Sequence, residues 1–357
     1  MGSHQLNQRP PANLRERARV AGNPVIEGGL AWFVWSGEKP VKLHGDFTDW
    51  YPEQAIELQP AGEDLWAACF EFTPDAYLEY TFMDGEKRLR DPFNPRRTPN
   101  GVGHYNQFFY MPEGHPTQLT IRRPGVKAGI ITEHRLETGW MLPGSRRALS
   151  LYRPPLDEPC PLLLVFDGQD YLKRAKLVTQ VENLVALGRV RPLALAMIQP
   201  FQPSRMLEYD CSDVTLTFLL KVLLPFARHH LNLIDPVGQP GAWGVMGASM
   251  GGVMSLYTAL RLPELFGNVL SQSGAFEPYG PNPVIFDLIE NFPTLPLRIW
   301  MDAGLYEWLF PSNRSMSALL EKKGYAQQYR EFSGSHNYPS WRDDLSHGLE
   351  WLFPASG

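Results

Sequence analysis

The 357-residue sequence is poor in cysteine, with only Cys69, Cys160 and Cys211, which lie far apart. This spacing argues against a disulfide framework and against the paired cysteines of zinc or redox motifs. We therefore expect free thiols and a cytoplasmic protein. The sequence also lacks the run of about 18 apolar residues that a membrane-spanning helix needs, and we expect no membrane partner. Residues 1–20 contain no apolar stretch typical of a secretory signal.

Clusters of basic residues are also missing. The formal net charge is -5, and Lys and Arg are scattered along the chain. Since a nucleic-acid-binding surface concentrates basic charge on one element, we expect no nucleic-acid partner. Apolar residues make up 43% of the chain, which is enough for an ordinary buried core.

Residues 28–112 have the pattern of a small all-β sandwich domain. Turn-forming residues separate short, aromatic-rich runs of alternating polarity, which lie at 30–35, 40–45, 65–72 and 77–85. This spacing is typical of an antiparallel sandwich. We assign residues 1–27 to an N-terminal extension, and a connector at 112–118 marks the domain boundary.

Strands and helices alternate in residues 119–357. Helical stretches near 173–187 and 214–230 lie among predicted strands at 147–153, 161–168, 192–200, 242–247, 267–274, 297–304 and 327–332. Alternation of this kind predicts an α/β domain with a mostly parallel sheet that helices cover on both faces. The active site of such a sheet lies at the carboxyl ends of its strands.

One strand ends in Gly247-Ala248-Ser249-Met250-Gly251, a G-x-S-x-G pentapeptide followed by a predicted helix. In the α/β-hydrolase fold this context places a nucleophilic serine on a strained strand-to-helix turn. The amide of Met250 can then donate to an oxyanion. A second donor comes from the loop after an earlier strand, and the amide of Gln169 is our candidate.

The triad of an α/β-hydrolase follows the chain order serine, acid, histidine. His336 lies in a loop after the last predicted strand, whereas His347 lies within the closing helix, so His336 is the predicted base. Asp302 and Glu307 follow the strand at 297–304, and we favour Glu307 because it lies in the loop proper. Ser249 would attack an ester carbonyl through an acyl-enzyme, with no metal or organic cofactor.

Longer motifs resemble the enterochelin esterase branch of the esterase D group. They include LLLVFDGQDYL, SRMLEYD, GASMGG, MDAGLYEW and GSHNYPSWRDDLSHGLEWL, in that order. The resemblance implies hydrolysis of an ester or lactone in a catecholate siderophore, and it supports Glu307 as the acid. It also places Arg205 near the substrate, although Arg205 could instead pair with Glu208. Tyr306 and Trp341 are candidates for stacking against an aromatic substrate.

The first domain resembles the early-set, glycogen-binding domains that occur beside isoamylases. Trp50 and Asn106 match two sugar-binding positions, whereas Thr81 and Lys87 replace the lysine and tryptophan of the other two. Carbohydrate binding is therefore doubtful, and we expect a β-domain that helps to form the wall of the active site. Two other functions remain open: a feruloyl or acetyl carbohydrate esterase, and a non-catalytic scaffold.

Overall fold

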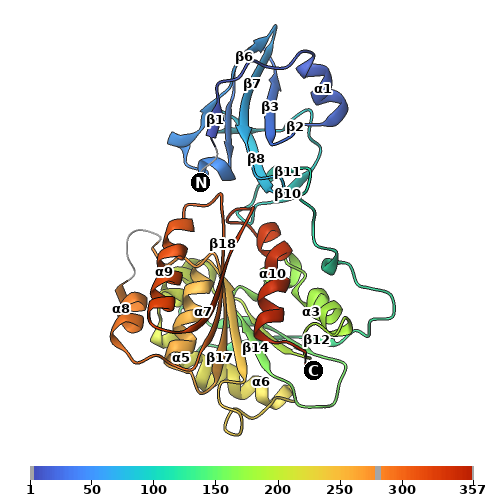
Figure 1. Ribbon diagram of the computed structural model, residues 1–357. Coiled ribbons are helices and arrows are strands. Elements are labelled where there is room, and N and C mark those ends of the chain that lie inside the picture. Colours follow the sequence, from blue (N-terminus) through green and yellow to red (C-terminus); the bar gives the residue numbers. More distant parts are fainter. Residues whose placement is uncertain (1–3, 278–282, 356–357) are drawn as a thin grey trace. The chain divides into compact units, whose positions relative to one another are not determined.

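The computed structural model describes residues 4–277 and 283–355 (Figure 1). The chain divides into two compact units, which we name the β unit and the α/β unit. The β unit comprises Met1–Pro116, Gly304–Trp308 and Phe332–Ser340. The α/β unit comprises Thr117–Ala303, Leu309–Glu331 and Trp341–Gly357. Two short segments from the C-terminal half of the chain thus belong to the unit that the N-terminal residues build.

Antiparallel strands form two sheets in the β unit. The strands are β1 (His4–Leu6), β2 (Val25–Glu27), β3 (Leu30–Ser36), β4 (Lys42–Gly45), β5 (Ile56–Glu57), β6 (Gln59–Gly62), β7 (Leu65–Glu71), β8 (Tyr77–Asp84), β9 (Lys87–Leu89), β10 (Arg97–Pro99) and β11 (Tyr105–Tyr110). One sheet has the order β1-β7-β3-β2 with β6 beside β7. The other has the order β10-β11-β8-β4-β5 with β9 beside β8.

Alternation along β3 explains how the first sheet is covered on both faces. Ala31 and Phe33 pack into the core between the two sheets, where Phe33 contacts the rings of several other aromatic residues. Trp32 and Val34 point to the opposite face and pack against the helix α1 (Leu14–Ala21). Strand period two therefore gives each face its own apolar set.

Residues 1–27, which we expected to form an extension, contribute elements to this sandwich. β1 pairs with β7 and β2 pairs with β3, both antiparallel. These strands have three residues each, too short to show a period-two pattern in the sequence.

The α/β unit is built on one mostly parallel sheet of order β12-β13-β15-β14-β16-β17-β18-β19. Its strands are β12 (Ile130–Glu137), β13 (Arg146–Arg153), β14 (Leu162–Val165), β15 (Ala194–Ile198), β16 (Trp243–Ala248), β17 (Phe266–Gln272), β18 (Arg298–Gly304) and β19 (Ala326–Phe332). β14 to β18 pair in parallel, whereas β12 and β13 are antiparallel. The predicted mostly parallel sheet is confirmed. β12 was not predicted, because this edge strand is largely exposed and polar.

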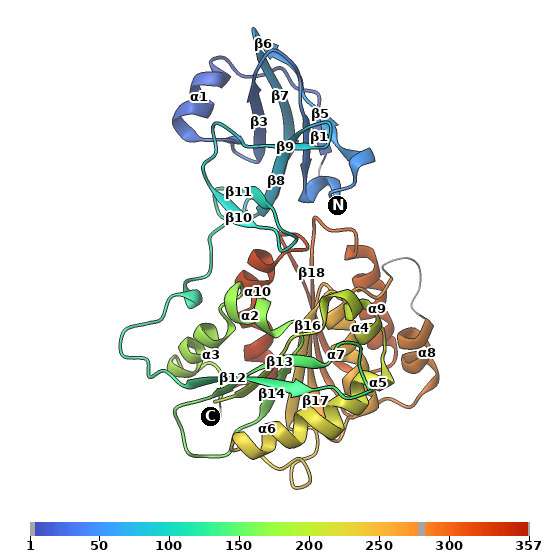
Figure 2. The same ribbon diagram turned by 180° about the vertical axis from the view of Figure 1, so that it is seen from behind.

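Helices cover both faces of this sheet. They are α2 (Gly168–Lys173), α3 (Leu177–Ala186), α4 (Arg205–Tyr209), α5 (Asp213–Phe218), the π-helical η5 (Leu219–Leu223), α6 (Leu224–His230), α7 (Met250–Arg261), α8 (Pro283–Asn291), α9 (Phe310–Lys322) and α10 (Tyr338–Leu352). α3 and α10 lie on one face, and α5, α7 and α9 lie on the other (Figures 1 and 2). Strands β14, β15, β16 and β17 are buried along their whole length, as expected for strands between two helical layers.

Candidate active site

Ser249 lies on a sharp turn between a buried strand and a buried helix. β16 ends at Ala248 and α7 begins at Met250, and Ser249 between them has φ 59° and ψ −125°. This backbone conformation is strained for a residue with a side chain. The Ser249 N–H donates to the carbonyl oxygen of Gln272 (2.9 Å), and its own carbonyl accepts from the N–H of Ala275 (3.1 Å). These features match the geometry of a nucleophile elbow.

The two glycines of the pentapeptide allow the chain to pass close to itself. A Cβ on Gly247 would lie 2.5 Å from the backbone of Gly251, and a Cβ on Gly251 would lie 3.2 Å from Oδ2 of Asp167. The first distance is a collision with backbone atoms, which cannot swing aside as a side chain can. The turn that strains Ser249 therefore depends on Gly247.

The two predicted oxyanion donors lie in the same unit. Met250 is the first residue of α7, where backbone N–H groups have no partner within the helix. The N–H of Gln169 donates to Oε1 of Gln199 (3.1 Å). An oxyanion can bind the Gln169 amide only after the Gln199 side chain turns away, so this donor stays a prediction.

His336 and Glu307 form a hydrogen-bonded pair in the β unit. Nδ1 of His336 lies 3.2 Å from Oε2 of Glu307, whose side chain is fully buried. A carboxylate at Nδ1 orients the ring and leaves Nε2 to act as a base. Asp302, the other candidate acid, is buried in the α/β unit, where its Oδ2 accepts from Nε1 of Trp300 (3.0 Å) and Nε2 of Gln272 (3.3 Å).

Hydrogen bonds between the loops 304–308 and 332–340 bring this pair together. The N–H of Leu305 donates to the carbonyl of Phe332 (2.9 Å), and the N–H of Tyr306 donates to that of Gly334 (3.1 Å). The Ser335 hydroxyl donates back to the carbonyl of Tyr306 (2.6 Å). The residues just before Glu307 and His336 are thus tied to each other.

An aromatic ring and a second carboxyl group lie near the pair. The Trp308 ring centroid is 4.6 Å from that of His336, and 38% of Trp308 is exposed. Burial raises the pKa of Asp49, and the charge of Glu307 raises it further. Because its ring lies beside His336 and is partly exposed, Trp308 offers an accessible apolar surface next to the imidazole.

Arg205 forms a bidentate ion pair with Asp167, through Nε at 2.8 Å and Nη2 at 2.6 Å. Burial raises the pKa of Asp167, and the hydrogen bonds and charge of Arg205 oppose that shift. Glu208, the alternative partner considered for Arg205, forms its own bidentate pair with the buried Arg147. The Arg205 guanidinium thus compensates a buried carboxylate beside the elbow, and its contact with substrate stays a prediction.

Tyr306 and Trp341, the two predicted stacking residues, are both buried. The Tyr306 hydroxyl accepts from the N–H of Thr73 (2.9 Å), and its ring packs edge-on against Phe72. The Trp341 indole N–H donates to the Ser273 hydroxyl (2.8 Å). These contacts favour packing for both rings over the predicted contact with substrate.

The two residues that match sugar-binding positions are engaged within the β unit. The Trp50 indole N–H donates to Oδ1 of Asp46 (2.9 Å). The Asn106 amide donates to Oε2 of Glu79 (2.8 Å). The polar groups of Trp50 and Asn106 thus form hydrogen bonds within the β unit.

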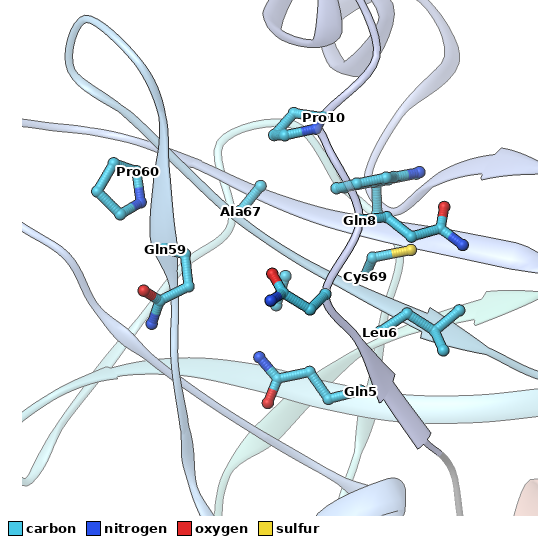
Figure 3. A pocket seen from close by; sticks show the side chains of 11 residues that line it. Gln5, Leu6, Gln8, Pro10, Gln59, Pro60, Ala67 and Cys69 are labelled. Atoms are coloured by element: carbon cyan, nitrogen blue, oxygen red, sulfur yellow. The ribbon is translucent and has the colours of Figure 1, made fainter.

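A pocket of about 590 Å³ lies elsewhere in the β unit, against β1, β6 and β7 (Figure 3). Gln5, Gln59 and Cys69 are among the side chains that line it, and none of the predicted catalytic residues does. Within residues 4–277 and 283–355, no group of His, Cys, Asp and Glu could hold a metal ion. No helix in those ranges is long and apolar enough to cross a membrane.

Sequence reasoning missed Asp46 and Asn337, which are hydrogen-bonded to each other in the β unit (3.2 Å). Burial raises the pKa of Asp46 well above its usual range, the Glu79 carboxylate raises it further, and hydrogen bonds from Glu79 and Trp50 lower it. The only signals were the turn GDF and the position of Asn337 directly after His336. Neither signal reveals that two residues so distant in sequence meet.

A mostly parallel sheet with helices on both faces and a serine on a strained strand-to-helix turn defines an α/β-hydrolase. The protein family described as "Putative esterase" matches residues 142–352. The chain belongs to that family.

Similarity to individual proteins points the same way. The chain is 28% identical over 228 residues to the iron(III) enterobactin esterase of Dickeya dadantii, a match that covers 58% of this chain and 52% of the relative. It is 27% identical over 272 residues to the iron(III) enterobactin esterase of Escherichia coli O6:H1 (strain CFT073). This match covers 73% of this chain and 66% of the relative. The chain therefore spans about half to two thirds of these curated relatives.

Among solved structures, the enterobactin esterase from Shigella flexneri, in the presence of enterobactin, is similar in fold. The TM-score is 0.72 at 22% identity, covering 90% of this chain and 92% of that one. The resemblance to enterochelin esterases inferred from the sequence motifs is confirmed.

Proposed function

We propose that this protein is a serine carboxylic ester hydrolase with Ser249 as nucleophile, His336 as general base and Glu307 as the orienting acid. The observation that carries the proposal is the strained elbow at Ser249 in a chain of an esterase family. The hydrogen bond between His336 and Glu307 supports it independently, because a base needs a carboxylate to fix its tautomer.

In the proposed reaction, the Ser249 hydroxyl oxygen attacks the ester carbonyl and its proton passes to Nε2 of His336. The amides of Met250 and Gln169 stabilise the oxyanion of the tetrahedral intermediate. As the C–O bond breaks, the imidazolium returns the proton to the departing alcohol and an acyl-enzyme remains. Water then attacks the acyl-enzyme with His336 again as base, which releases the acid and restores Ser249.

For the substrate, we propose an ester or lactone of a catecholate siderophore. The relatives named iron(III) enterobactin esterase support this class, as does the related structure solved in the presence of enterobactin. The accessible ring of Trp308 beside His336 suits a substrate that carries aromatic rings. A cytoplasmic location belongs to the same proposal, and it is supported by Cys69, Cys160 and Cys211, none of which forms a disulfide bond.

The test compares wild type with Ser249→Ala on a catecholate trilactone siderophore, methyl ferulate and p-nitrophenyl acetate. We expect the highest kcat/KM on the trilactone and a loss of at least about 10³-fold in the variant, as for other serine triads. A preference for ferulate or acetate would instead support a carbohydrate esterase. Absence of Ser249-dependent turnover on all three substrates would refute the serine mechanism and favour a non-catalytic scaffold.

A further inference from the structure

Asp46 is a buried carboxylate whose hydrogen bonds reach beyond the sandwich strands. It begins the 3-10 turn η1 (Asp46–Thr48) directly after β4, and only 3% of it is exposed. Oδ1 accepts from the indole N–H of Trp50 (2.9 Å), and Oδ2 accepts from the N–H of Glu79 (2.7 Å). Oδ2 also accepts from the side-chain amide of Asn337 (3.2 Å). An apolar side chain could fill this position but could not accept any of these bonds.

Both polar atoms of the Asn337 side-chain amide form hydrogen bonds. Its Nδ2 donates to Asp46, and its Oδ1 accepts from the N–H of Ser340 in the first turn of α10 (3.0 Å). Because Asn337 directly follows His336, these two bonds restrict the backbone that carries the imidazole.

The sandwich also forms hydrogen bonds to the loop that carries Glu307 and to the loop that carries His336. The Thr73 N–H donates to the hydroxyl of Tyr306, the residue before Glu307 (2.9 Å). The Tyr77 N–H donates to the carbonyl of Ser333, three residues before His336 (3.0 Å). Three strands or turns of the sandwich thus supply bonds to the two loops that carry the histidine and its acid.

We propose that Asp46 is a positioning residue for His336, acting through Asn337 to fix the imidazole against Glu307. This inference rests on the proposed esterase function and gives the sandwich a role other than sugar binding. Catalytic groups must be held within about 0.5 Å of their productive geometry, and a shift of about 1 Å costs on the order of 10²-fold in rate. The hydrogen bond from the side-chain amide of Asn337 to Asp46 can supply that restraint.

Asp46→Ala tests the proposal, with Asp91→Ala as the matched control. Asp91 is equally buried in the same unit and accepts from Nδ2 of Asn23, the hydroxyl of Tyr80 and the N–H of Phe93. These three donors all lie outside the loops 304–308 and 332–340. Both variants lose a buried acceptor for three donors, so both are expected to lower Tm.

On p-nitrophenyl acetate at 25 °C, Asp46→Ala is expected to lower kcat about 10- to 100-fold with KM changed less than about threefold. The acid limb of its pH–rate profile should also move. Asp91→Ala should keep kcat within about twofold of wild type and keep the profile. Unchanged kcat in Asp46→Ala, or equal losses in both variants, would overturn the positioning role.

An exchange of partners tests the bond itself. Asn337→Asp keeps the acceptor for the Ser340 N–H but places a second carboxyl group against Asp46, so kcat should fall. The double variant Asp46→Asn/Asn337→Asp restores one donor and one acceptor across the same contact, although the Glu79 N–H loses its acceptor, because it bonds the same Oδ2 of Asp46. We expect it to recover at least about tenfold in kcat over Asn337→Asp alone, since opposed acceptors are replaced by a hydrogen bond. No recovery, in a double variant whose Tm is at least that of Asn337→Asp, would mean that the contact does not act through this bond.

A readout without turnover separates this inference from the esterase proposal. If wild type shows no Ser249-dependent hydrolysis, the esterase proposal fails. The NMR titration of the His336 ring, assigned with His336→Ala, then decides whether Asp46 positions it. A titration changed by Asp46→Ala and not by Asp91→Ala supports the positioning, and one unchanged by both contradicts it.

Discussion

At the scale of single residues, the carboxylate that meets His336 is that of Glu307. Glu307→Gln would place an amide at Nδ1, and its N–H₂ can hold the imidazole in the tautomer that cannot act as a base at Nε2. We expect kcat on p-nitrophenyl acetate to fall about 10²- to 10⁴-fold, the range for an orienting acid. Steady-state kinetics of the purified variant measure this loss.

Asp302→Asn is the matched control for Glu307, since Asp302 is also fully buried but bonds Trp300 and Gln272. It should lower Tm slightly, because the amide oxygen can still accept from both side chains but forms weaker hydrogen bonds than a charged carboxylate. Its kcat should change far less than that of Glu307→Gln. A larger kcat loss in Asp302→Asn would transfer the role of triad acid to Asp302.

The thiols offer a second test at this scale. Burial raises the pKa of Cys69 and of Cys160 to about 11. At pH 8 only about one in 10³ of each is then thiolate, the reactive form. Cys211, which is partly exposed, should therefore react first with a disulfide reagent, at one equivalent per folded chain. Three equivalents without denaturant would contradict the burial of the other two.

The raised pKa of Cys160 also predicts how the free energy of unfolding depends on pH. The pKa of Cys160 is higher in the folded chain, about 11, than its ordinary value of 9.0, so folding favours the protonated thiol. This contribution is complete below about pH 9 and is lost as pH rises toward 11. The free energy of unfolding should fall over that window, and it should fall less steeply in Cys160→Ala. Urea titrations at pH 8, 9.5 and 11 measure the difference.

At the scale of elements, the strand-to-helix turn between β16 and α7 depends on how closely its two glycines approach. Gly247→Ala would place Cβ 2.5 Å from the backbone of Gly251, whereas Gly251→Ala would meet the Asp167 carboxylate at 3.2 Å. Backbone cannot yield as a side chain can, so Gly247→Ala should cost about 1–3 kcal/mol or more in the free energy of unfolding. Gly251→Ala should cost less.

Chemical denaturation of both glycine variants gives these energies, and labelling of Ser249 by a fluorophosphonate reports the geometry of the turn. We expect slower labelling in Gly247→Ala because Ser249 is displaced from the strained conformation that the turn imposes. Equal stability and labelling in the two variants would show that the close approach at Gly247 is relaxed in solution.

At the scale of the whole molecule, the residues assigned to one reaction belong to two compact units. Ser249 lies in the α/β unit, whereas Glu307 and His336 lie in the β unit. Under the proposed roles of His336 and Glu307, unfolding of the β unit should abolish hydrolysis even while the α/β unit stays folded. In Asp91→Ala, activity at 25 °C should be kept, but the temperature at which activity is lost should fall.

Activity and far-UV circular dichroism, recorded against temperature, test this coupling. The drop in the temperature of activity loss should exceed the drop in the midpoint of helix melting, because the long helices belong mainly to the α/β unit. Parallel shifts of both curves would mean that the two units unfold as one cooperative system.

Local patterns in the sequence were sufficient for the α/β architecture and for the turn at Ser249. Buried parallel strands appear as continuous apolar runs, and a strand-to-helix turn needs small residues at Gly247 and Gly251. Both signals lie within a window of a few residues, so they can be read without the fold. The same holds for the order of Ser249, Glu307 and His336 along the chain.

Long-range packing was required for the partners of the site residues. Glu307 rather than Asp302 bonds His336, Arg205 pairs with Asp167, and Asp46 meets Asn337 across 291 positions of sequence. Such contacts depend on strand order, register and the path of loops between sheets, and no local window contains that information. Side-chain chemistry limits which residues can pair, and only the folded backbone brings two of them within hydrogen-bonding distance.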